Sequence, residues 1–215
     1  MRILLASHRP LEDPDPVWNL RLLAEGLIAA GHPTRCLLVA DAPQQDPSWV
    51  ARRIVCNPDI ASADLKFALP GFAPHRAQRV AFDQLTDRQL SQYREALRRA
   101  LDREVDEFNP HLIHADAIWL WGHLALETGA AYVLSASLAE LETRQANPRF
   151  ARFTDEAAEN AGRILVAENS VRAAVLDTFD VSDARVVQVA PGAHDEIAAV
   201  YRRVLKERYG DEPDW

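Results

Sequence analysis

Five short polar segments of the sequence each follow a short apolar run, and together they are the candidates for a ligand site. They are Ser7-His8-Arg9, His114-Ala115-Asp116, Ser135-Ala136-Ser137, Glu168-Asn169-Ser170 and Pro191-Gly192-Ala193-His194-Asp195. If the apolar runs are parallel strands, their carboxyl ends meet at one edge of a sheet, where open α/β proteins bind ligands. Turn and helix-capping residues are polar in any such protein. One segment alone therefore indicates little, but five together favour a cleft.

Side-chain alternation along the strands predicts which of these residues share a face of the sheet. Side chains two apart share a face, so we expect His114 and Asp116 to lie together, beside Trp119, and to bind ligand hydroxyls. Ser135 and Ser137 share a face in the same way. The residues expected to bind ligand are His114, Asp116, Trp119, Ser135, Ser137, Asn169, Ser170 and His194. Asn169 and Ser170 could present a helix N-terminus to an anion, or simply cap the helix.

Catalytic roles are left unassigned, with His8, Asp116 and Ser137 as candidates. No Gly-x-Ser-x-Gly, Gly-x-Gly-x-x-Gly or Walker sequence is present, which argues against the serine hydrolase, NAD-binding and P-loop classes. In His111-x-x-His114-x-Asp116, alternation leaves one histidine and one aspartate on a face, too few for zinc. We therefore expect no metal and no cofactor.

Composition limits the partners and the compartment. The 215 residues include 24 Lys+Arg and 32 Asp+Glu, so the net charge of −8 argues against nucleic acid as a partner. No apolar run approaches the roughly 20 residues of a membrane span, and no signal peptide is expected. Cys36 and Cys56 form no Cys-x-x-Cys motif and fit a reducing cytoplasm, although a disulfide between them stays open.

Elements that would position the site alternate along the chain. Apolar runs predict strands at 2–7, 34–39, 53–56, 112–114, 132–135, 164–167 and 186–189. Helical periodicity predicts helices at 17–30, 86–108, 119–128, 138–145, 149–161, 169–179 and 195–209, the second opened by a capping box from Thr86 to Gln89. The pattern predicts one doubly wound, Rossmann-like α/β domain over 1–209. It would have a mainly parallel sheet of six or seven strands, a C-terminal helix packed back on that sheet, and a frayed acidic tail at 210–215.

The ordered set of motifs resembles the N-terminal, acceptor-side domain of family-4-type glycosyltransferases with the GT-B fold. The motifs that carry the resemblance are the opening strand–helix–strand of 1–39 with its Ala-Ala-Gly-His turn, Phe108–Ala115, Trp119–Gly122, Thr128–Ser135, 161–175 and 187–195. The resemblance implies a small-molecule or glycan acceptor as the ligand.

Departures from the family are as informative as the motifs. The family's glycine-rich turn after the first strand reads His8-Arg9-Pro10-Leu11-Glu12 here, and its "H-G" histidine position is occupied by Ser137. A second common histidine is replaced by Ala117. In the family, a donor-binding domain follows the junction at 187–195. Here the junction runs directly into a segment similar to the family's last helix.

Three interpretations follow from the resemblance and its departures. The chain is the acceptor-side half of a glycosyltransferase that needs a separate donor-binding partner; or it is a non-catalytic descendant that binds a ligand or regulates a transferase. In the third, it is a repurposed small-molecule enzyme using His8, Asp116, Ser135, Ser137 or His194. A surface left bare by the missing domain would favour either the donor-domain partner or a homo-oligomer.

Overall fold

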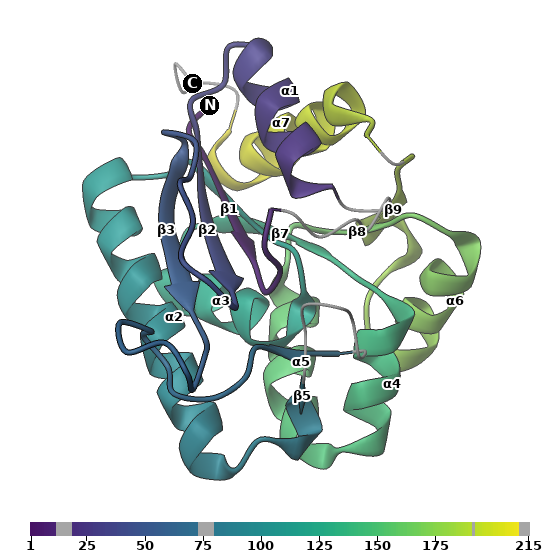
Figure 1. Cartoon of the computed structure of the whole chain (residues 1–215). Coiled ribbons are helices and arrows are strands. Elements are labelled where there is room, and N and C mark those ends of the chain that lie inside the picture. Colours follow the sequence, from purple (N-terminus) through teal and green to yellow (C-terminus); the bar gives the residue numbers. More distant parts are fainter. Residues whose placement is uncertain (12–18, 73–79, 191, 211–215) are drawn as a thin grey trace.

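Seven parallel strands form the central sheet of the chain, shown in a computed structural model that describes residues 1–11, 19–72, 80–190 and 192–210 (Figure 1). The spatial order is β3-β2-β1-β6-β7-β8-β9, and every neighbouring pair is parallel. The strands are β1 (Ile3–Ser7), β2 (Thr34–Ala40), β3 (Val50–Val55), β6 (Leu112–Ala115), β7 (Ala131–Ser135), β8 (Arg163–Val166) and β9 (Val186–Gln188). A separate pair joins β4 (Pro70–Gly71) to β5 (Val80–Ala81). The doubly wound α/β fold predicted from the sequence is therefore confirmed.

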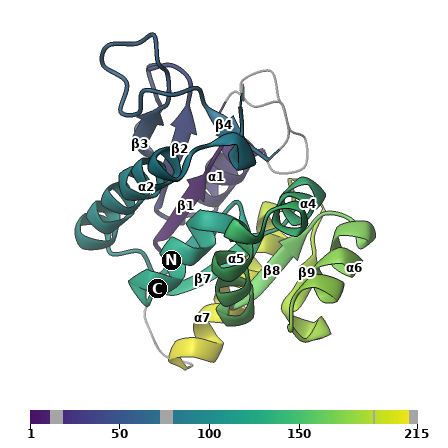
Figure 2. The ribbon, with the colours of Figure 1, turned by 90° about the horizontal axis from the view of Figure 1, so that it is seen from below.

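Helices cover both faces of the sheet (Figures 1 and 2). They are α1 (Leu20–Ala29), α2 (Asp87–Phe108), α3 (His123–Thr128), α4 (Leu138–Ala146), α5 (Pro148–Asn160), α6 (Asn169–Thr178) and α7 (His194–Tyr209). Short 3-10 turns occupy Phe82–Gln84 and Asp183–Arg185. Helices α1 and α7 lie together on one face, and the other helices lie on the opposite face. The C-terminal helix thus packs back on the sheet, as predicted.

Two buried clusters hold these layers together, and alternation along β1 divides its residues between them. Leu4 and Ala6 face the larger cluster beneath α2 to α6, whereas Ile3 and Leu5 face the cluster under α1 and α7. Continuing this alternation sends the side chains of Ser7 and His8 to opposite faces. Burial of these apolar side chains is the main stabilising contribution to the fold.

The strand order reverses between β1 and β6, which is the topological switch point of the sheet. Chains leaving the carboxyl ends of these two strands turn to opposite faces, which opens a crevice where ligands bind in this class of fold. Ser7 ends β1, and Asp116 directly follows β6. The switch point therefore falls between two of the five polar segments.

Several predicted boundaries differ from the observed ones. The expected helix at 119–128 is instead an irregular turn at Ile118–Gly122 followed by α3, because Trp119 is extended and Leu120 has φ 61° and ψ −60°. The N-cap of α6 is Glu168, so neither Asn169 nor Ser170 caps that helix. The capping box of Thr86 and Gln89 is present as predicted.

The structure also bears on the two cysteines, on membrane helices and on the predicted C-terminal tail. Cys36 and Cys56 are both buried free thiols, so the disulfide left open above is not formed. No helix in the described ranges is long and apolar enough to cross a membrane. Pro191 and residues 211–215, which include most of the predicted tail, lie outside the described residues.

Candidate functional site

An ion pair joins the two segments at the switch point. Arg9 Nη2 donates to Asp116 Oδ2 at 2.9 Å and to Oδ1 at 3.1 Å, and Arg9 Nε donates to Oδ2 at 3.2 Å. Ser7 Oγ donates to the same carboxylate at 2.8 Å and accepts the backbone N–H of Arg9 at 3.0 Å. The side chains of Arg9 and Asp116 are 19% and 8% exposed, so the pair is largely buried. Such a bidentate pair has a fixed geometry.

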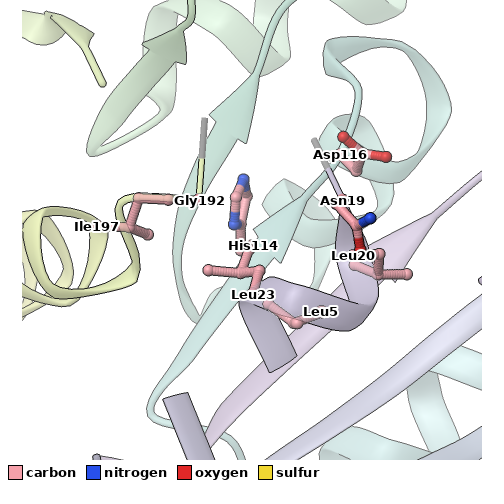
Figure 3. A pocket seen from close by; sticks show the side chains of 8 residues that line it. All are labelled: Leu5, Asn19, Leu20, Leu23, His114, Asp116, Gly192 and Ile197. Atoms are coloured by element: carbon pink, nitrogen blue, oxygen red, sulfur yellow. The ribbon is translucent and has the colours of Figure 1, made fainter. Parts of the chain in front are cut away.

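A small pocket lies beside this pair, between α1, the ends of β1 and β6, and the start of α7 (Figure 3). Apolar side chains from Leu5, Leu20, Leu23 and Ile197 form part of its wall, and polar groups come from Asn19, His114 and Asp116, with Gly192 completing the lining. In Figure 3, His114 lies between Gly192 on one side and Asn19 and Asp116 on the other. The pocket's cavity volume of about 20 Å³ holds little more than a water molecule, so it can receive only one group of a larger ligand.

His114 is 3% exposed, and both of its ring nitrogens are engaged. Nδ1 lies 2.6 Å from the hydroxyl of Tyr201 on α7, and Nε2 lies 2.7 Å from Ser135 Oγ. Burial lowers the pKa of His114 to about 3. The ring is therefore neutral at pH 7, and it links β6, β7 and α7. Ser135, 2% exposed, acts in this structure as its partner.

His8 points to the opposite face, into a cluster of aromatic rings that includes Phe82, Tyr93 and Trp119. Its Nε2 lies 3.1 Å from the carbonyl oxygen of Trp119, and its Nδ1 lies 2.8 Å from the Tyr93 hydroxyl. A carbonyl oxygen only accepts, so Nε2 carries the proton and Nδ1 accepts from Tyr93. Burial lowers the pKa of His8 to about 3, despite the bond to Trp119. As placed here, His8 has no free nitrogen for acid–base chemistry.

Trp119 does not lie beside His114 and Asp116, as the sequence led us to expect. It is 3% exposed and packs within the aromatic cluster on the other face of the sheet, with its ring centroid 4.7 Å from that of Phe150. The chain is extended at Ala117 and then enters the irregular turn at Ile118–Gly122. Trp119 is thus a core side chain in this structure and has no surface for stacking on a sugar.

Glu140 of α4 supports the irregular turn at Ile118–Gly122. It is 2% exposed, and its Oε1 accepts the backbone N–H of Trp119 at 2.5 Å. Burial raises the pKa of Glu140 to about 8; the negative charge of Asp116 adds to this shift, whereas the amide bonds and Arg9 oppose it. The sequence offered no signal for this residue, because its role depends on a turn 21 positions earlier.

The remaining predicted residues are spread along the same edge. Ser137 is the N-cap of α4 and accepts the Glu140 N–H at 3.4 Å. Asn169 and Ser170 are exposed at the start of α6, with Ser170 Oγ donating to Glu168 at 3.2 Å. His194 is half-buried at the start of α7, where it packs so closely on Gly26 that a Cβ there would lie 2.6 Å from its ring. None of these four contacts the Arg9–Asp116 pair in the bonds of the described residues.

Sequence reasoning missed three residues that shape the site. Asn19 lines the pocket while capping α1, since its Oδ1 accepts the Leu22 N–H at 3.0 Å. Arg9 was noted only as part of a segment, and Glu140 was not noted. A polar residue immediately before an amphipathic helix is a capping signal that could have identified Asn19.

The side chains at the switch point limit the chemistry that this site can support. Across the described ranges, His, Cys, Asp and Glu form no group of three placed to hold a metal. Both strand-end histidines are neutral and buried. The Arg9–Asp116 pair and Asn19 can donate to and accept from ligand hydroxyls, which is recognition chemistry.

Comparisons with known proteins bear on the fold. No family model matches the chain, and no curated protein matches it in sequence. A structure described as sucrose-phosphate synthase 27_220_406_426 from Thermosynechococcus elongatus matches with a TM-score of 0.57 at 14% identity, covering 95% of this chain and 99% of that one. A longer structure of the same enzyme matches with a TM-score of 0.56 at 15% identity, covering 88% of this chain and 48% of that one.

A lipopolysaccharide outer core galactosyltransferase, WaaB, matches with a TM-score of 0.50 at 10% identity, covering 88% of this chain and 45% of that one. The chain thus spans about half the length of the two longer structures. Likeness at these identities shows the fold and not the activity. The chain has the Rossmann-like α/β fold found in one half of these GT-B glycosyltransferases.

Proposed function

We propose that this chain is the acceptor-side half of a glycosyltransferase, and that it transfers a sugar only together with a separate donor-binding protein. The observation that carries the proposal is the extent of the structural match. The chain covers 99% of the shorter sucrose-phosphate synthase structure but 48% of the longer one. This extent of coverage supports the proposal that the chain corresponds to one half of a transferase.

The site supports a role in acceptor binding. Asp116 and Asn19 line the pocket at the switch point, and Arg9 pairs with Asp116, so an acceptor hydroxyl at the mouth of the pocket would meet both donors and acceptors. A partner seated on this edge would exclude water and hold the donor over the acceptor, which group transfer requires. The acceptor is a small hydroxyl-bearing molecule or a glycan.

A second function is supported by the state of the histidines and by the family comparison. Ser137 stands where the resembling family has its reaction-centre histidine, and it serves here as a helix cap. His8 and His114 are buried with both nitrogens engaged. A non-catalytic descendant that binds the same ligand, or regulates a transferase, would not need a histidine that is free to transfer protons.

The two functions separate in a reconstitution. The full chain, its co-purified partner and a radiolabelled nucleotide sugar would be incubated with sugar acceptors, and transfer would be measured with each protein alone and with both. The transferase proposal predicts turnover only with both proteins, and loss of turnover in Asp116→Ala but not in Asp102→Ala, an exposed α2 control. Ligand binding without transfer in any combination would leave the non-catalytic function. Turnover by the purified chain alone would instead indicate a repurposed enzyme.

A further inference from the structure

A chain of buried hydrogen bonds runs beneath the switch point. The Tyr93 hydroxyl donates to His8 Nδ1 at 2.8 Å, His8 Nε2–H donates to the Trp119 carbonyl at 3.1 Å, and the Trp119 N–H donates to Glu140 Oε1 at 2.5 Å. Every donor points the same way, so the chain begins on α2 and ends at a buried carboxyl on α4. The last two bonds lie on different peptide groups, since the carbonyl belongs to the 119–120 peptide and the N–H to the 118–119 peptide, so together they hold Trp119 on both sides.

These hydrogen bonds hold the backbone on both sides of the Arg9–Asp116 pair. His8 lies between Ser7 and Arg9, and Trp119 lies three residues after Asp116. The bond from His8 to Trp119 therefore ties one segment of the site directly to the other.

Leu120 makes the anchoring necessary. Its φ of 61° and ψ of −60° resemble the classic γ-turn, a strained conformation for a non-glycine residue. Strain of this kind persists only where the surroundings hold it. The groups that hold it are His8 on the Trp119 carbonyl and Glu140 on the Trp119 amide.

We propose that Glu140 is a positioning residue of the switch-point site: by accepting the Trp119 N–H it holds the Leu120 turn, and the turn fixes Asp116 against Arg9. The inference rests on the proposed function only in treating Arg9 and Asp116 as the ligand contacts. The positioning itself is a property of the ligand-free chain.

Electrostatics couple Glu140 to the same pair. Burial raises its pKa to about 8, Asp116 raises it further, and Arg9 and the two amides of the turn lower it. The neighbouring α5 presents Asp155, which is already bound to Arg144 of α4, and His8 adds no charge because its pKa is about 3. When Glu140 loses its proton, a second negative charge therefore appears near Asp116, and both carboxylates attract the Arg9 guanidinium.

The test uses the ligand-free full chain, labelled with ¹³C for NMR. The carboxyl carbons of Glu140 and Asp116 would be followed from about pH 6 to about pH 10, which spans the expected midpoint near 8. We expect the Asp116 signal to shift with the same midpoint as that of Glu140. In Glu140→Gln, which keeps an oxygen acceptor for the Trp119 N–H, the Asp116 signal should stay flat, while the exposed-site control Glu142→Gln should titrate as the wild type does.

Hydrogen exchange supplies the second readout. In Glu140→Ala the amide of Trp119 should exchange about tenfold faster than in the wild type, and Glu140→Gln should restore its protection. If Glu140→Ala does not fold, the NMR titrations of the wild type and of Glu140→Gln still test the proposal. An Asp116 signal that ignores Glu140, or a glutamine variant with an unprotected Trp119 amide, would overturn the proposal. Failure to find an acceptor would overturn the proposed function and leave these ligand-free results unchanged.

Discussion

Arg9 and Asp116, 107 positions apart in the sequence, meet at 2.9 Å between Nη2 and Oδ2 and close the end of the sheet where the strand order reverses. Ser7 shares the same carboxylate at 2.8 Å. The pair joins the β1 and β6 segments on the α1 and α7 face, while the bond from His8 to Trp119 joins them on the opposite face. The site is therefore held from both sides of the sheet.

Replacing Asp116 with Asn should destabilise the fold. The substitution removes the Asp116 charge from beside the half-buried Arg9 guanidinium, and weakening such a pair costs about 1–3 kcal/mol of unfolding free energy. Urea denaturation of Asp116→Asn would measure this, with Asp102→Asn on the exposed side of α2 as the control. Equal midpoints for the two variants would show that the pair contributes nothing to stability.

Raising the pH from 4.5 to 8 should weaken the fold through Glu140. The pKa of its carboxyl is about 8 in the folded chain against an ordinary value of 4.5, so between these values the folded state holds a proton that the unfolded state lacks. This contribution is complete below pH 4.5 and is lost as pH rises to 8, at about 1.4 kcal/mol per pH unit. Glu140→Gln should therefore gain stability relative to the wild type as pH rises, in denaturant titrations at a series of pH values. The matched variant Glu142→Gln should show no such trend, and parallel curves for wild type and Glu140→Gln would refute the assignment.

Acid should weaken the fold through His8 and His114. Burial lowers both pKa values from 6.5 to about 3, so the unfolded state binds protons that the folded state refuses as pH falls below 6.5. Each ring should lower the free energy of unfolding by about 1.4 kcal/mol for every pH unit that the pH falls over this range. His114→Asn should remove one ring's share of the slope, whatever its effect on stability at neutral pH. Ring ¹⁵N shifts that report a charged His8 or His114 at about pH 5 would contradict the burial argument.

The contact of the last helix with the sheet can be tested at Gly162 and Val204. A Cβ on Gly162 would overlap Val204 of α7 and would lie 3.2 Å from the Tyr132 carbonyl oxygen. Gly162→Ala should destabilise the fold by about 1–3 kcal/mol through overpacking. Val204→Ala opens space at the same place, so the double variant should be more stable than the sum of the single changes predicts. Strict additivity would mean that α7 does not pack on Gly162 as described.

Much of the fold was predictable because its signals are local. The apolar runs at Ile3–Ser7 and Leu112–Ala115 are bounded by polar turns, and the Thr86 capping box marks the start of α2 within one residue. Alternation also placed His114 and Asp116 on one side, and both line the pocket.

The turn after Asp116 was not predictable in the same way. Ile118–Gly122 is apolar throughout, so its sequence has no periodicity that would distinguish a regular helix from an irregular turn, and it does not show which side of the sheet each tryptophan faces. Glu140 and Tyr201 take their roles from contacts distant in sequence, 21 and 87 positions away. Only a structure brings such partners together.

The central claim is that this chain is one half of a two-protein transferase, and its most direct test is the native mass of the endogenous complex. The protein would be purified gently from its own host and analysed by native mass spectrometry, and any companion would be tested for nucleotide-sugar binding. The account predicts the 24.0 kDa chain together with a second protein that binds a nucleotide sugar and supports transfer only in the presence of this chain. A monomer, a homo-oligomer, or a companion that binds no nucleotide sugar would contradict it.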